Sequence, residues 1–443
     1  MHSPGKRQTL VLFGVTGDLV RRKILPALYQ LEHKGLLAND FCCLGVGRQE
    51  VTNKDLLEKA LIKDINPIVW RRFASKFRYC KLQLDNLETY HSLKKEVEHF
   101  GKKTELLFFL AVSTSFFSVI AHHLVASSCW QEGRSSLFLE KPFGSDFMVA
   151  QQLQRDLEGL IGAENIHLID HYLSKPGIGS LLQVRTLPGI ASLWNKESIR
   201  CIQVVATESL GIEGRAPFYD QQGHIKDLVQ SHLLQILSLT GALLTDQNLK
   251  EARSHFLKSL FLSHSKPIHI GQYTEGKIKG KTVCGYLDEL GVASNSQTET
   301  FAAMCFESAL PEWKGVFFEV FTGKRLHQKL TEVIILFHSG KRLVIRSFPD
   351  TSIMGMPSEE KKSCRALECL WKQSLSGYEA ILMASFSQNE SVFLSPKEAA
   401  LGWEVLAPYF REKQHLHYYE AGSWGPPETL KLYSSIFEQI GRG

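Results

Sequence analysis

The sequence has few of the features that mark secreted, membrane or nucleic-acid-binding proteins. Its nine cysteines form no Cys-x-x-Cys pair and show no zinc-ligand spacing, which argues against a structural zinc site. The most apolar region, residues 106–128, contains Ser, Thr and His and is too polar to span a bilayer. The 51 Lys+Arg exceed the 46 Asp+Glu by only 5, without long basic blocks, so neither a nucleic-acid partner nor a membrane surface is indicated.

The first residues also lack a targeting signal. The stretch MHSPGKRQTL has no apolar core of a signal peptide and leads directly into a strand-like run. An odd number of scattered cysteines is typical of free thiols in a reducing compartment. We therefore expect a cytoplasmic protein, and its length of 443 residues allows two or three domains.

The first third alternates short apolar runs with segments of helical periodicity. The strand-like runs are residues 9–13, 41–46, 77–82, 106–112 and 135–140, and the helical segments lie near residues 19–32, 55–63, 69–76, 87–100 and 116–126. Buried strands that alternate with helices predict βαβ units and a mostly parallel sheet.

Beyond about residue 172 the pattern changes to longer strand-like runs. These are residues 199–208, 298–306, 315–323 and 331–338. The last three follow one another without helices between them, which predicts an antiparallel α+β domain. The chain is therefore expected to hold an α/β domain over residues 1–172 and a large α+β domain over residues 173–443.

A glycine turn follows the first predicted strand, where Gly14-Val15-Thr16-Gly17-Asp18-Leu19 opens the next helix. Such a turn lets backbone N–H groups approach a pyrophosphate, and the helix dipole favours the anion. The usual G-x-G-x-x-G spelling is incomplete, so an ordinary βα turn is the alternative. The position after the first strand favours a coenzyme, bound by Gly14, Thr16, Gly17, Asp18 and Leu19.

The second predicted strand ends in Gly45-Val46-Gly47-Arg48, where a dinucleotide-binding fold faces the adenosine ribose. A base at this position suits a 2′-phosphate, so Arg48 favours NADP, with NAD as a weaker alternative. Glu50 is the opposing feature, because a carboxylate here would repel the phosphate. A solvated surface arginine is the other interpretation.

The octet LIDHYLSK, residues 168–175, places Asp170, His171, Tyr172 and Lys175 within six positions at the end of an apolar run. One interpretation is a strand that ends in a polar turn. The other is an anion site beside a catalytic carboxylate. The octet alone leaves both open, because polar clusters of this size are common at loop ends.

Seven blocks, taken in order, resemble the glucose-6-phosphate dehydrogenase family. They are LFGVTGDLVRRKILPAL, LEKPFGSD, IDHYLSK, ESLGIEGRAPFYDQQGHIKDLVQSHLLQIL, TETFAAM, FTGKRL and YEAGSWGP. Several blocks in the right order are more specific than any one of them. The resemblance implies a Rossmann-like NADP domain followed by an α+β domain with a mainly antiparallel sheet for substrate binding and oligomerisation. It also implies oxidation of glucose 6-phosphate at C1 in the pentose phosphate pathway by a homodimer or homotetramer.

The resemblance also implies roles for particular residues. His232 is expected to be the general base and Asp170 the carboxylate that orients it. The expected 6-phosphate ligands are His171, Tyr172 and Lys175; Lys141 and Lys324 are further cationic contacts, Lys141 beside the coenzyme as well; Glu208 and Asp227 accept hydrogen bonds from the sugar hydroxyls. A histidine of near-neutral pKa suits removal of a proton as hydride leaves, and this chemistry requires no metal.

Several of these residues have simpler interpretations. His232 falls on the apolar stripe of a predicted helix, where a buried core histidine is common. Lys324 in a Thr-Gly-Lys-Arg turn is otherwise a hairpin lysine. Pro142, after Lys141, is expected to form a rigid turn, with a cis bond as in the family.

The chain departs from the family pattern near the expected ligand. The departures are Ser113-Thr114 for Pro-Pro, Ser174 for Gly, Pro176 for Glu, Phe321 for Arg and Phe348 for a polar residue. They leave two alternatives open: a non-catalytic paralogue that binds coenzyme or regulates a partner, and an oxidoreductase of the glucose-fructose type. The second type shares the glycine turn and the EKP block but is not expected to contain DHYLSK.

Overall fold

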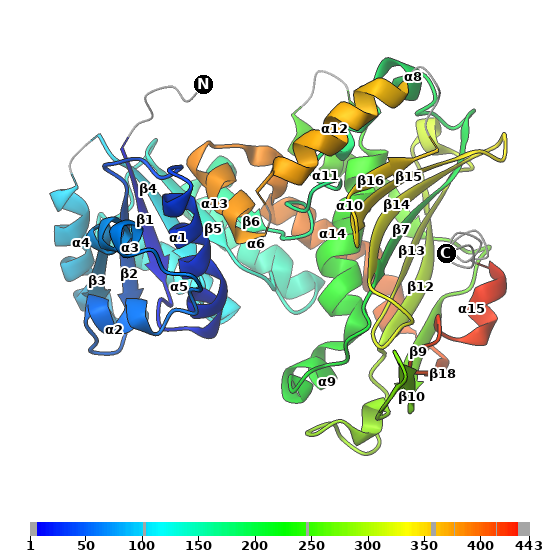
Figure 1. Cartoon of the computed structure of the whole chain (residues 1–443), viewed down its shortest axis with the longest axis horizontal. Helices are drawn as coiled ribbons and strands as arrows, with labels where there is room; N and C mark the ends of the chain where they lie inside the picture. The colour runs from blue at the N-terminus through cyan, green and yellow to red at the C-terminus, as the bar shows by residue number, and fades with distance from the viewer. Residues whose placement is uncertain are drawn as a thin grey trace. The chain divides into compact units, whose positions relative to one another are not determined.

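The structure, a computed structural model, describes residues 7–100, 103–244, 248–355, 360–375, 377–412 and 414–432. The chain divides into two compact units (Figure 1). The first comprises residues 1–174 and 375–400, and the second comprises residues 175–374 and 401–443. Within the described ranges, every helix falls short of the length or the apolar character that a bilayer crossing needs.

The first unit contains a seven-stranded sheet of order β17-β6-β5-β4-β1-β2-β3. Its strands are β1 (Gln8–Phe13), β2 (Cys42–Gly47), β3 (Phe77–Lys81), β4 (Glu105–Leu110), β5 (Ser135–Leu139), β6 (Ile166–Ile169) and β17 (Phe393–Leu394). All pairs are parallel except β17 with β6. Strands β2 and β4 are buried along their whole length, as expected when both faces of a sheet are covered. The predicted Rossmann-like domain is confirmed.

Helices connect these strands as the alternating pattern predicted. They are the π-helical η1 (Val20–Ile24), then α1 (Leu25–His33), α2 (Asn53–Glu58), α3 (Pro67–Ser75), α4 (Tyr90–His99), α5 (Phe117–Ala126) and α6 (Phe147–Ile161). Thr52 begins α2 with a reciprocal capping box to Asp55, which satisfies two backbone N–H groups at the start of the helix.

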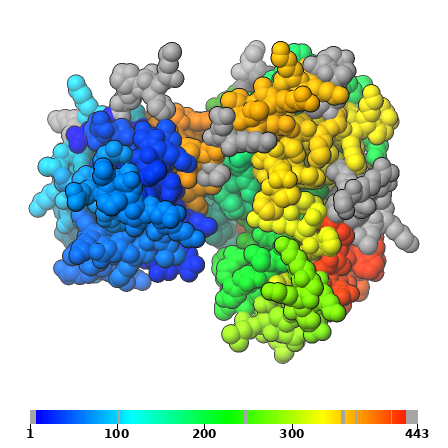
Figure 2. Space-filling view, in the orientation of Figure 1, coloured from blue at the N-terminus to red at the C-terminus, as the bar shows by residue number. Residues whose placement is uncertain are grey.

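A late segment of the chain, residues 375–400, belongs to the first unit. Its helix α13 (Tyr378–Phe386) packs on α1, and the Gln8 side chain donates to the Phe386 carbonyl over 2.7 Å. Ile381 and Leu382 are fully buried in the core of this unit. In the space-filling view of Figure 2, orange residues of this segment lie next to the blue N-terminal residues. The sequence analysis expected one division at residue 172 and did not expect a later segment to join the first domain. That division stays a prediction. The apolar side chains of α13 are removed from water when the helix packs on this core, and this burial stabilises the arrangement.

The second unit contains a nine-stranded sheet of order β16-β15-β14-β7-β13-β12-β9-β18, with β8 paired to β12. The strands are β7 (Ile199–Thr207), β8 (Leu260–Leu262), β9 (His269–Thr274), β12 (Phe301–Ser308), β13 (Phe317–Gly323), β14 (Leu330–Phe337), β15 (Arg342–Phe348), β16 (Ser352–Met354) and β18 (Leu416–Glu420). The predicted antiparallel character is confirmed, since only β7 with β13 and β9 with β18 run parallel among its described strands.

The second unit also contains several helices. They include α9 (Ala216–His224), the π-helical η5 (Ile225–Leu233), α10 (Leu234–Gly241), α11 (Leu249–Ser259), α12 (Lys361–Gln373) and α15 (Pro427–Leu432), while α14 (Pro396–Arg411) begins in the first unit. Of these helices, α10 packs on β7 and α12 packs on β16. Phe318 of β13 lies between Phe256 of α11 and Trp313, with ring centroids 4.9 and 5.6 Å apart. The Trp313 indole also donates to the Gly241 carbonyl over 2.7 Å, which fixes the end of α10.

Candidate active site

The glycine turn after β1 has no room for a side chain at its first position. Gly14 has φ +75°, and a Cβ there would lie 2.4 Å from the Ala111 carbonyl oxygen. Its N–H donates to the Val46 carbonyl over 3.0 Å, and the Gly17 N–H donates back to Gly14 over 2.8 Å. The turn therefore joins the carboxyl ends of β1, β2 and β4, where a Rossmann fold holds its dinucleotide.

A cavity of about 270 Å³ lies at this turn and the end of β2. Its lining is Val15, Thr16, Asp18, Arg21, Leu25, Gln49, Val51, Leu56 and Lys59. Leu19 packs on the core of the unit. The hydrogen bond from Arg22 to Asp18, 2.7 Å long, lowers the pKa of that exposed carboxyl below its ordinary value. The residues at the turn therefore fit a dinucleotide.

Arg48 follows β2 directly and is exposed. Its guanidinium forms no hydrogen bond or ion pair with another described residue. The opposing carboxylate of Glu50 accepts a hydrogen bond from Lys81 over 2.7 Å, and this bond lowers the pKa of Glu50. The charge of Glu50, which follows β2, is therefore partly offset by the last residue of the neighbouring strand β3.

Lys141 and Asp170 meet where β5 and β6 end. Both residues follow neighbouring parallel strands, whose carboxyl ends share one edge of the sheet. The Lys141 ammonium lies 3.2 Å from Asp170 Oδ2, and the Tyr172 N–H donates to Asp170 Oδ1 over 2.8 Å. Asp170 is fully buried, whereas Lys141 is 22% exposed. The bond between Lys141 and Pro142 is cis, as expected.

Glu140 stands beside this pair and received no role from the sequence. Burial raises the pKa of Glu140 to about 7, although the Tyr378 hydroxyl donates to it over 2.9 Å. The nearby charge of Asp170 also raises the pKa of Glu140, whereas Lys141 lowers it. Its partner Tyr378 comes from the returning helix α13, which no local pattern around Glu140 could have indicated.

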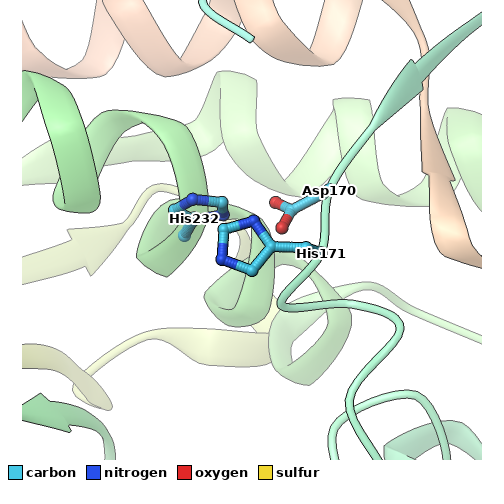
Figure 3. A group of neighbouring side chains, drawn as sticks. All are labelled: Asp170, His171 and His232. Atoms are coloured by element: carbon cyan, nitrogen blue, oxygen red, sulfur yellow. The ribbon is translucent and has the colours of Figure 1, made fainter. Parts of the chain in front are cut away.

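His171 and Tyr172 continue the loop after Asp170. His171 is exposed and Tyr172 is buried, with ring centroids 5.0 Å apart. Ser174, which replaces the family glycine, is buried and donates its hydroxyl to the His171 carbonyl over 3.1 Å. Figure 3 shows Asp170 and His171 on this loop, and His232 on its own helix.

Lys175 begins the second unit, where its ammonium donates to the Thr331 hydroxyl over 3.5 Å. His232 lies on η5 and is 5% exposed, on the same buried stripe as Leu228 and Val229. Asp227, on the same element, is half-buried. The predicted helix is confirmed as a π-helical stretch, a form that is rare in general and frequent at functional sites.

Glu299 fixes the start of this π-helical stretch. Its side chain accepts the Ile225 N–H over 3.0 Å, and its carbonyl accepts the His224 N–H over 3.1 Å. Gly223 has φ +71°, and a Cβ there would lie 2.5 Å from the Glu299 carboxylate. Glycine is therefore required where the chain enters the helix that bears His232.

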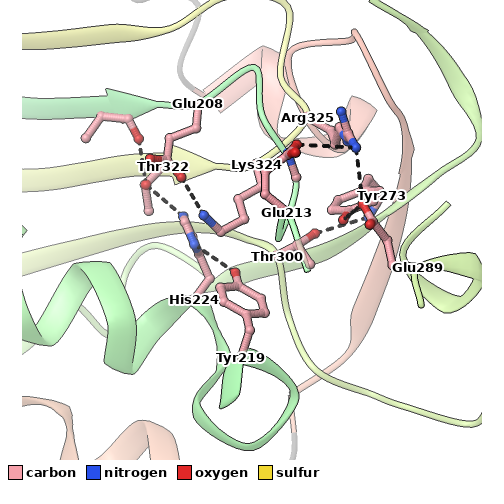
Figure 4. A network of polar contacts seen from close by, with 12 residues as sticks. Glu208, Glu213, Tyr219, His224, Tyr273, Glu289, Thr300, Thr322, Lys324 and Arg325 are labelled. Atoms are coloured by element: carbon pink, nitrogen blue, oxygen red, sulfur yellow. Dashed lines mark hydrogen bonds and ion pairs between the residues drawn. The ribbon is translucent and has the colours of Figure 1, made fainter. Parts of the chain in front are cut away.

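Glu208 and Lys324 form a second ion pair, at the ends of β7 and β13 (Figure 4). Their charged atoms lie 2.5 Å apart, and Lys324 Nζ lies 5.2 Å from the Tyr219 ring centroid. Burial would raise the pKa of Glu208, but the charge and hydrogen bond of Lys324 hold it below its ordinary value. These two predicted residues are therefore together within one unit.

His224 is a buried residue of this network that sequence reasoning missed. The Tyr219 hydroxyl lies 3.0 Å from His224 Nδ1, and His224 Nε2 lies 2.9 Å from the Thr322 hydroxyl (Figure 4). Thr322 donates its own proton to the Ala206 carbonyl over 2.6 Å, so Nε2 is the donor and Nδ1 the acceptor. Burial, followed by the charge of Lys324, lowers the pKa of His224 to about 3.

Two family models match the chain in order. "Glucose-6-phosphate dehydrogenase, NAD binding domain" matches residues 11–179, and "Glucose-6-phosphate dehydrogenase, C-terminal domain" matches residues 188–438. The chain belongs to the glucose-6-phosphate dehydrogenase family. The first domain of this family member is therefore an NAD(P)-binding domain.

Relatives and solved structures in this family are similar over almost the whole chain. The glucose-6-phosphate 1-dehydrogenase of Aggregatibacter actinomycetemcomitans is 31% identical over 96% of this chain and 95% of its own length. That of Dickeya dadantii is 29% identical with the same coverage. A glucose-6-phosphate dehydrogenase solved in complex with glucose 6-phosphate has a TM-score of 0.86 and 28% identity, over 98% of this chain and 99% of its own.

The positions that depart from the family pattern have their own packing. Phe321 is buried on β13 against Phe301, with ring centroids 5.1 Å apart. Phe348 is 37% exposed, and Lys329 Nζ lies 4.5 Å from its ring centroid. Thr114 donates its hydroxyl to the Pro142 carbonyl over 2.7 Å. These substitutions are accommodated in the fold.

Proposed function

We propose that this chain oxidises glucose 6-phosphate at C1 to 6-phosphogluconolactone, with NADP as the hydride acceptor. The observation that carries this proposal is that both domains of one enzyme family match the chain in order, over residues 11–179 and 188–438. The expected base, its orienting carboxylate and a phosphate ligand are present as His232, Asp170 and Lys175, whereas polar residues of the family pattern are replaced by Pro176, Phe321 and Phe348.

His232 is proposed to take the proton of the C1 hydroxyl as hydride leaves C1. Its buried position on a π-helical stretch supports a fixed ring orientation. Asp170 is proposed to orient this ring and stabilise the imidazolium that forms. When bound, NADP supplies the hydride acceptor. The glycine turn fits its pyrophosphate, because Gly14 leaves backbone in place of a side chain.

The two ion pairs are proposed to serve different parts of the substrate. In the Lys141–Asp170 pair the cation is the more exposed partner, which suits contact with phosphate groups of substrate or coenzyme. In the Glu208–Lys324 pair the carboxylate is the more exposed partner, which suits acceptance of sugar hydroxyls. Asp227 is proposed to share the second role.

The 6-phosphate is proposed to be held by His171, Tyr172 and Lys175. The Lys175 ammonium, the His171 imidazole and the Tyr172 phenol can each donate a hydrogen bond to the phosphate dianion, and hydrogen bonds to a charged group are the strong ones. Lys175 already donates to Thr331, so its ammonium is directed by the sheet of the second unit.

NADP is proposed to be preferred over NAD because of Arg48. Its exposed guanidinium follows β2, at the position that binds the ribose 2′ end in this fold. The Glu50–Lys81 ion pair supports the preference, since it weakens the repulsion between Glu50 and a 2′-phosphate.

A homodimer or homotetramer in the cytoplasm is proposed from the family resemblance. All nine cysteines are free thiols, which agrees with a reducing compartment. Sedimentation of the purified chain would measure its oligomeric state.

The test of the function is to follow NADPH absorbance after the purified chain is mixed with glucose 6-phosphate and NADP, and to identify the product. Rapid NADPH formation with glucose 6-phosphate, and little with unphosphorylated glucose, is the expected result. NADP binding without any turnover would instead support the non-catalytic, regulatory alternative. The departures from the family pattern at Phe321 and Phe348 are the reason to test that alternative.

A further inference from the structure

His224 is a fully buried histidine in the network of Figure 4 that also contains the Glu208–Lys324 ion pair. It is the last residue of α9 and directly precedes η5. Its backbone N–H donates to the Glu299 carbonyl over 3.1 Å, so the main chain is held here without the imidazole. The imidazole of His224 requires an explanation of its own, because burial of a polar ring costs free energy unless its nitrogens are hydrogen-bonded.

Both ring nitrogens of His224 have hydrogen-bond partners, on different elements. Nε2 lies 2.9 Å from the Thr322 hydroxyl of β13, and Nδ1 lies 3.0 Å from the Tyr219 hydroxyl of α9. The proton of Thr322 is already donated to the Ala206 carbonyl. His224 therefore donates to Thr322 and accepts from Tyr219, so the neutral imidazole ties the phenol to the sheet.

The ring of Tyr219 lies next to the Lys324 ammonium. Nζ of Lys324 is 5.2 Å from the ring centroid, within the range of a cation–π interaction. Both residues are only 2% exposed, and such an interaction is stronger when water is excluded. The same ammonium donates to Glu208 Oε2 over 2.5 Å. The phenol ring and the carboxylate therefore both hold the ammonium in place.

Glu208 ends this series of contacts and is its most accessible member. Its side chain is 32% exposed, and Oε2 is the oxygen bound to Lys324. The other oxygen, Oε1, accepts no hydrogen bond from a described residue. One carboxylate oxygen is therefore available for a sugar hydroxyl, while the other fixes the direction of the carboxylate.

We propose that His224 and Tyr219 are positioning residues for sugar binding. They hold the Lys324 ammonium and, through it, orient the Glu208 carboxylate toward the sugar hydroxyls. This inference rests on the proposed function, because that function assigns the sugar hydroxyls to Glu208. It adds that Lys324, which is almost completely buried, acts through Glu208 and not by contact with the substrate.

A purely structural histidine would give a different result. If His224 only fills the core, its replacement lowers the free energy of unfolding and leaves the affinity for the sugar unchanged. If His224 positions Glu208, the affinity for glucose 6-phosphate falls, while the affinity for NADP is unchanged because the glycine turn lies in the first unit. The affinity for the sugar is therefore the quantity that decides.

The experiment is a calorimetric titration of glucose 6-phosphate into the full-length parent, His224→Leu and a control, His269→Leu. His269 is a buried histidine of the same unit whose ring nitrogens have no hydrogen-bond partner among the described residues. The Kd for glucose 6-phosphate should rise by roughly tenfold in His224→Leu, the value of one hydrogen bond to a charged group. It should change by less than about twofold in His269→Leu, as should the Kd for NADP in both variants.

A second pair of variants tests the same contact if His224→Leu does not fold. Thr322→Val removes the hydroxyl that accepts from His224, whereas Thr322→Ser retains a hydroxyl. Thr322→Val should weaken glucose 6-phosphate binding by roughly threefold to tenfold, and Thr322→Ser should keep the parent's affinity.

Two outcomes would contradict the inference and are distinguishable. If the parent binds glucose 6-phosphate and the folded variant, His224→Leu or Thr322→Val, binds it equally well, the inference is overturned and the proposed function stands. If the parent binds NADP but no glucose 6-phosphate, the proposed function is overturned and this inference with it.

Discussion

The two units each place one ion pair at the carboxyl ends of two neighbouring parallel strands. In the first unit, Lys141 and Asp170 follow β5 and β6. In the second, Glu208 and Lys324 follow β7 and β13, one of two parallel pairs described in an otherwise antiparallel sheet. Parallel strands bring the residues after them to one edge, which explains why both pairs form.

The pairs differ in which charge is buried. Asp170 is fully buried while Lys141 is 22% exposed, whereas Lys324 is 2% exposed while Glu208 is 32% exposed. The more exposed partner is therefore the cation in the first unit and the carboxylate in the second. The same strand geometry therefore leaves a cation accessible at one sheet edge and a carboxylate accessible at the other.

The largest expected effect is on stability, when the more exposed partner of either pair is removed. Lys141→Met leaves Asp170 buried without its cation, and Glu208→Gln leaves Lys324 buried without its carboxylate. Each is expected to cost on the order of 3 kcal/mol in the free energy of unfolding. Urea denaturation followed by circular dichroism measures this loss.

The reciprocal substitutions are the controls for this asymmetry. Asp170→Asn and Lys324→Met leave behind the partner with access to water, so their losses in stability should be smaller. Larger losses of stability for these two variants than for Lys141→Met and Glu208→Gln would contradict the claim that removal of the exposed partner is the more costly change.

The next effect is the dependence of stability on pH that Glu140 produces in the first unit. Its pKa is raised from 4.5 to about 7, so between these values the folded state binds more protons than the unfolded state. The free energy of unfolding should therefore fall as pH rises through this window, by at most roughly 3 kcal/mol. Glu140→Gln, which can still accept from Tyr378, should remove this fall.

The control for this prediction is Glu88→Gln, which changes a carboxyl whose side chain is 87% exposed. It should retain the parent's decline of stability with pH. If Glu140→Gln and Glu88→Gln show the same decline as the parent, the raised pKa of Glu140 is not its source.

The first unit could be predicted in more detail than the second, for a physical reason. Strands β5 and β6 are consecutive in the chain and adjacent in the sheet, so the edge shared by Lys141 and Asp170 follows from a short connection, although the roles of both residues came from the family resemblance. Strands β7 and β13 are separated by more than a hundred residues, and no local pattern states that they pair. Only the resemblance to a family indicated Glu208 and Lys324.

Three other features depend on distant contacts and were missed for that reason. The succession of strands β12, β13 and β14 predicted the antiparallel character of the domain but not the strand order, in which β7 lies between β13 and β14. The sequence of the apolar helix α13 does not indicate which of the two cores the helix packs on. His224 has a partner on β13, Thr322, that is 98 residues away.

A smaller effect is expected on the substrate contact of Lys175. Lys175→Ala should lower kcat/KM for glucose 6-phosphate by roughly tenfold to a hundredfold, since it removes one charge-assisted hydrogen bond. The same variant should change kcat/KM for unphosphorylated glucose much less. Equal losses on both sugars would show that Lys175 does not contact the phosphate.

The smallest effect is expected at Arg48, which is exposed and would make one contact with the 2′-phosphate of the coenzyme. Arg48→Ala should lower the ratio of kcat/KM for NADP to that for NAD by about tenfold, the value of one exposed guanidinium–phosphate contact. Steady-state kinetics with both coenzymes measures the ratio. An unchanged ratio would identify Arg48 as a surface charge only and would move the coenzyme preference to another residue.

The most direct test of the account is a comparison of kcat and coenzyme affinity in the parent and in His232→Asn. The account assigns proton removal to this buried histidine of the second unit and coenzyme binding to the glycine turn of the first. His232→Asn should therefore lower kcat by on the order of 10²–10⁴ while the Kd for NADP stays within about twofold. A variant that keeps most of the parent's kcat would contradict the account.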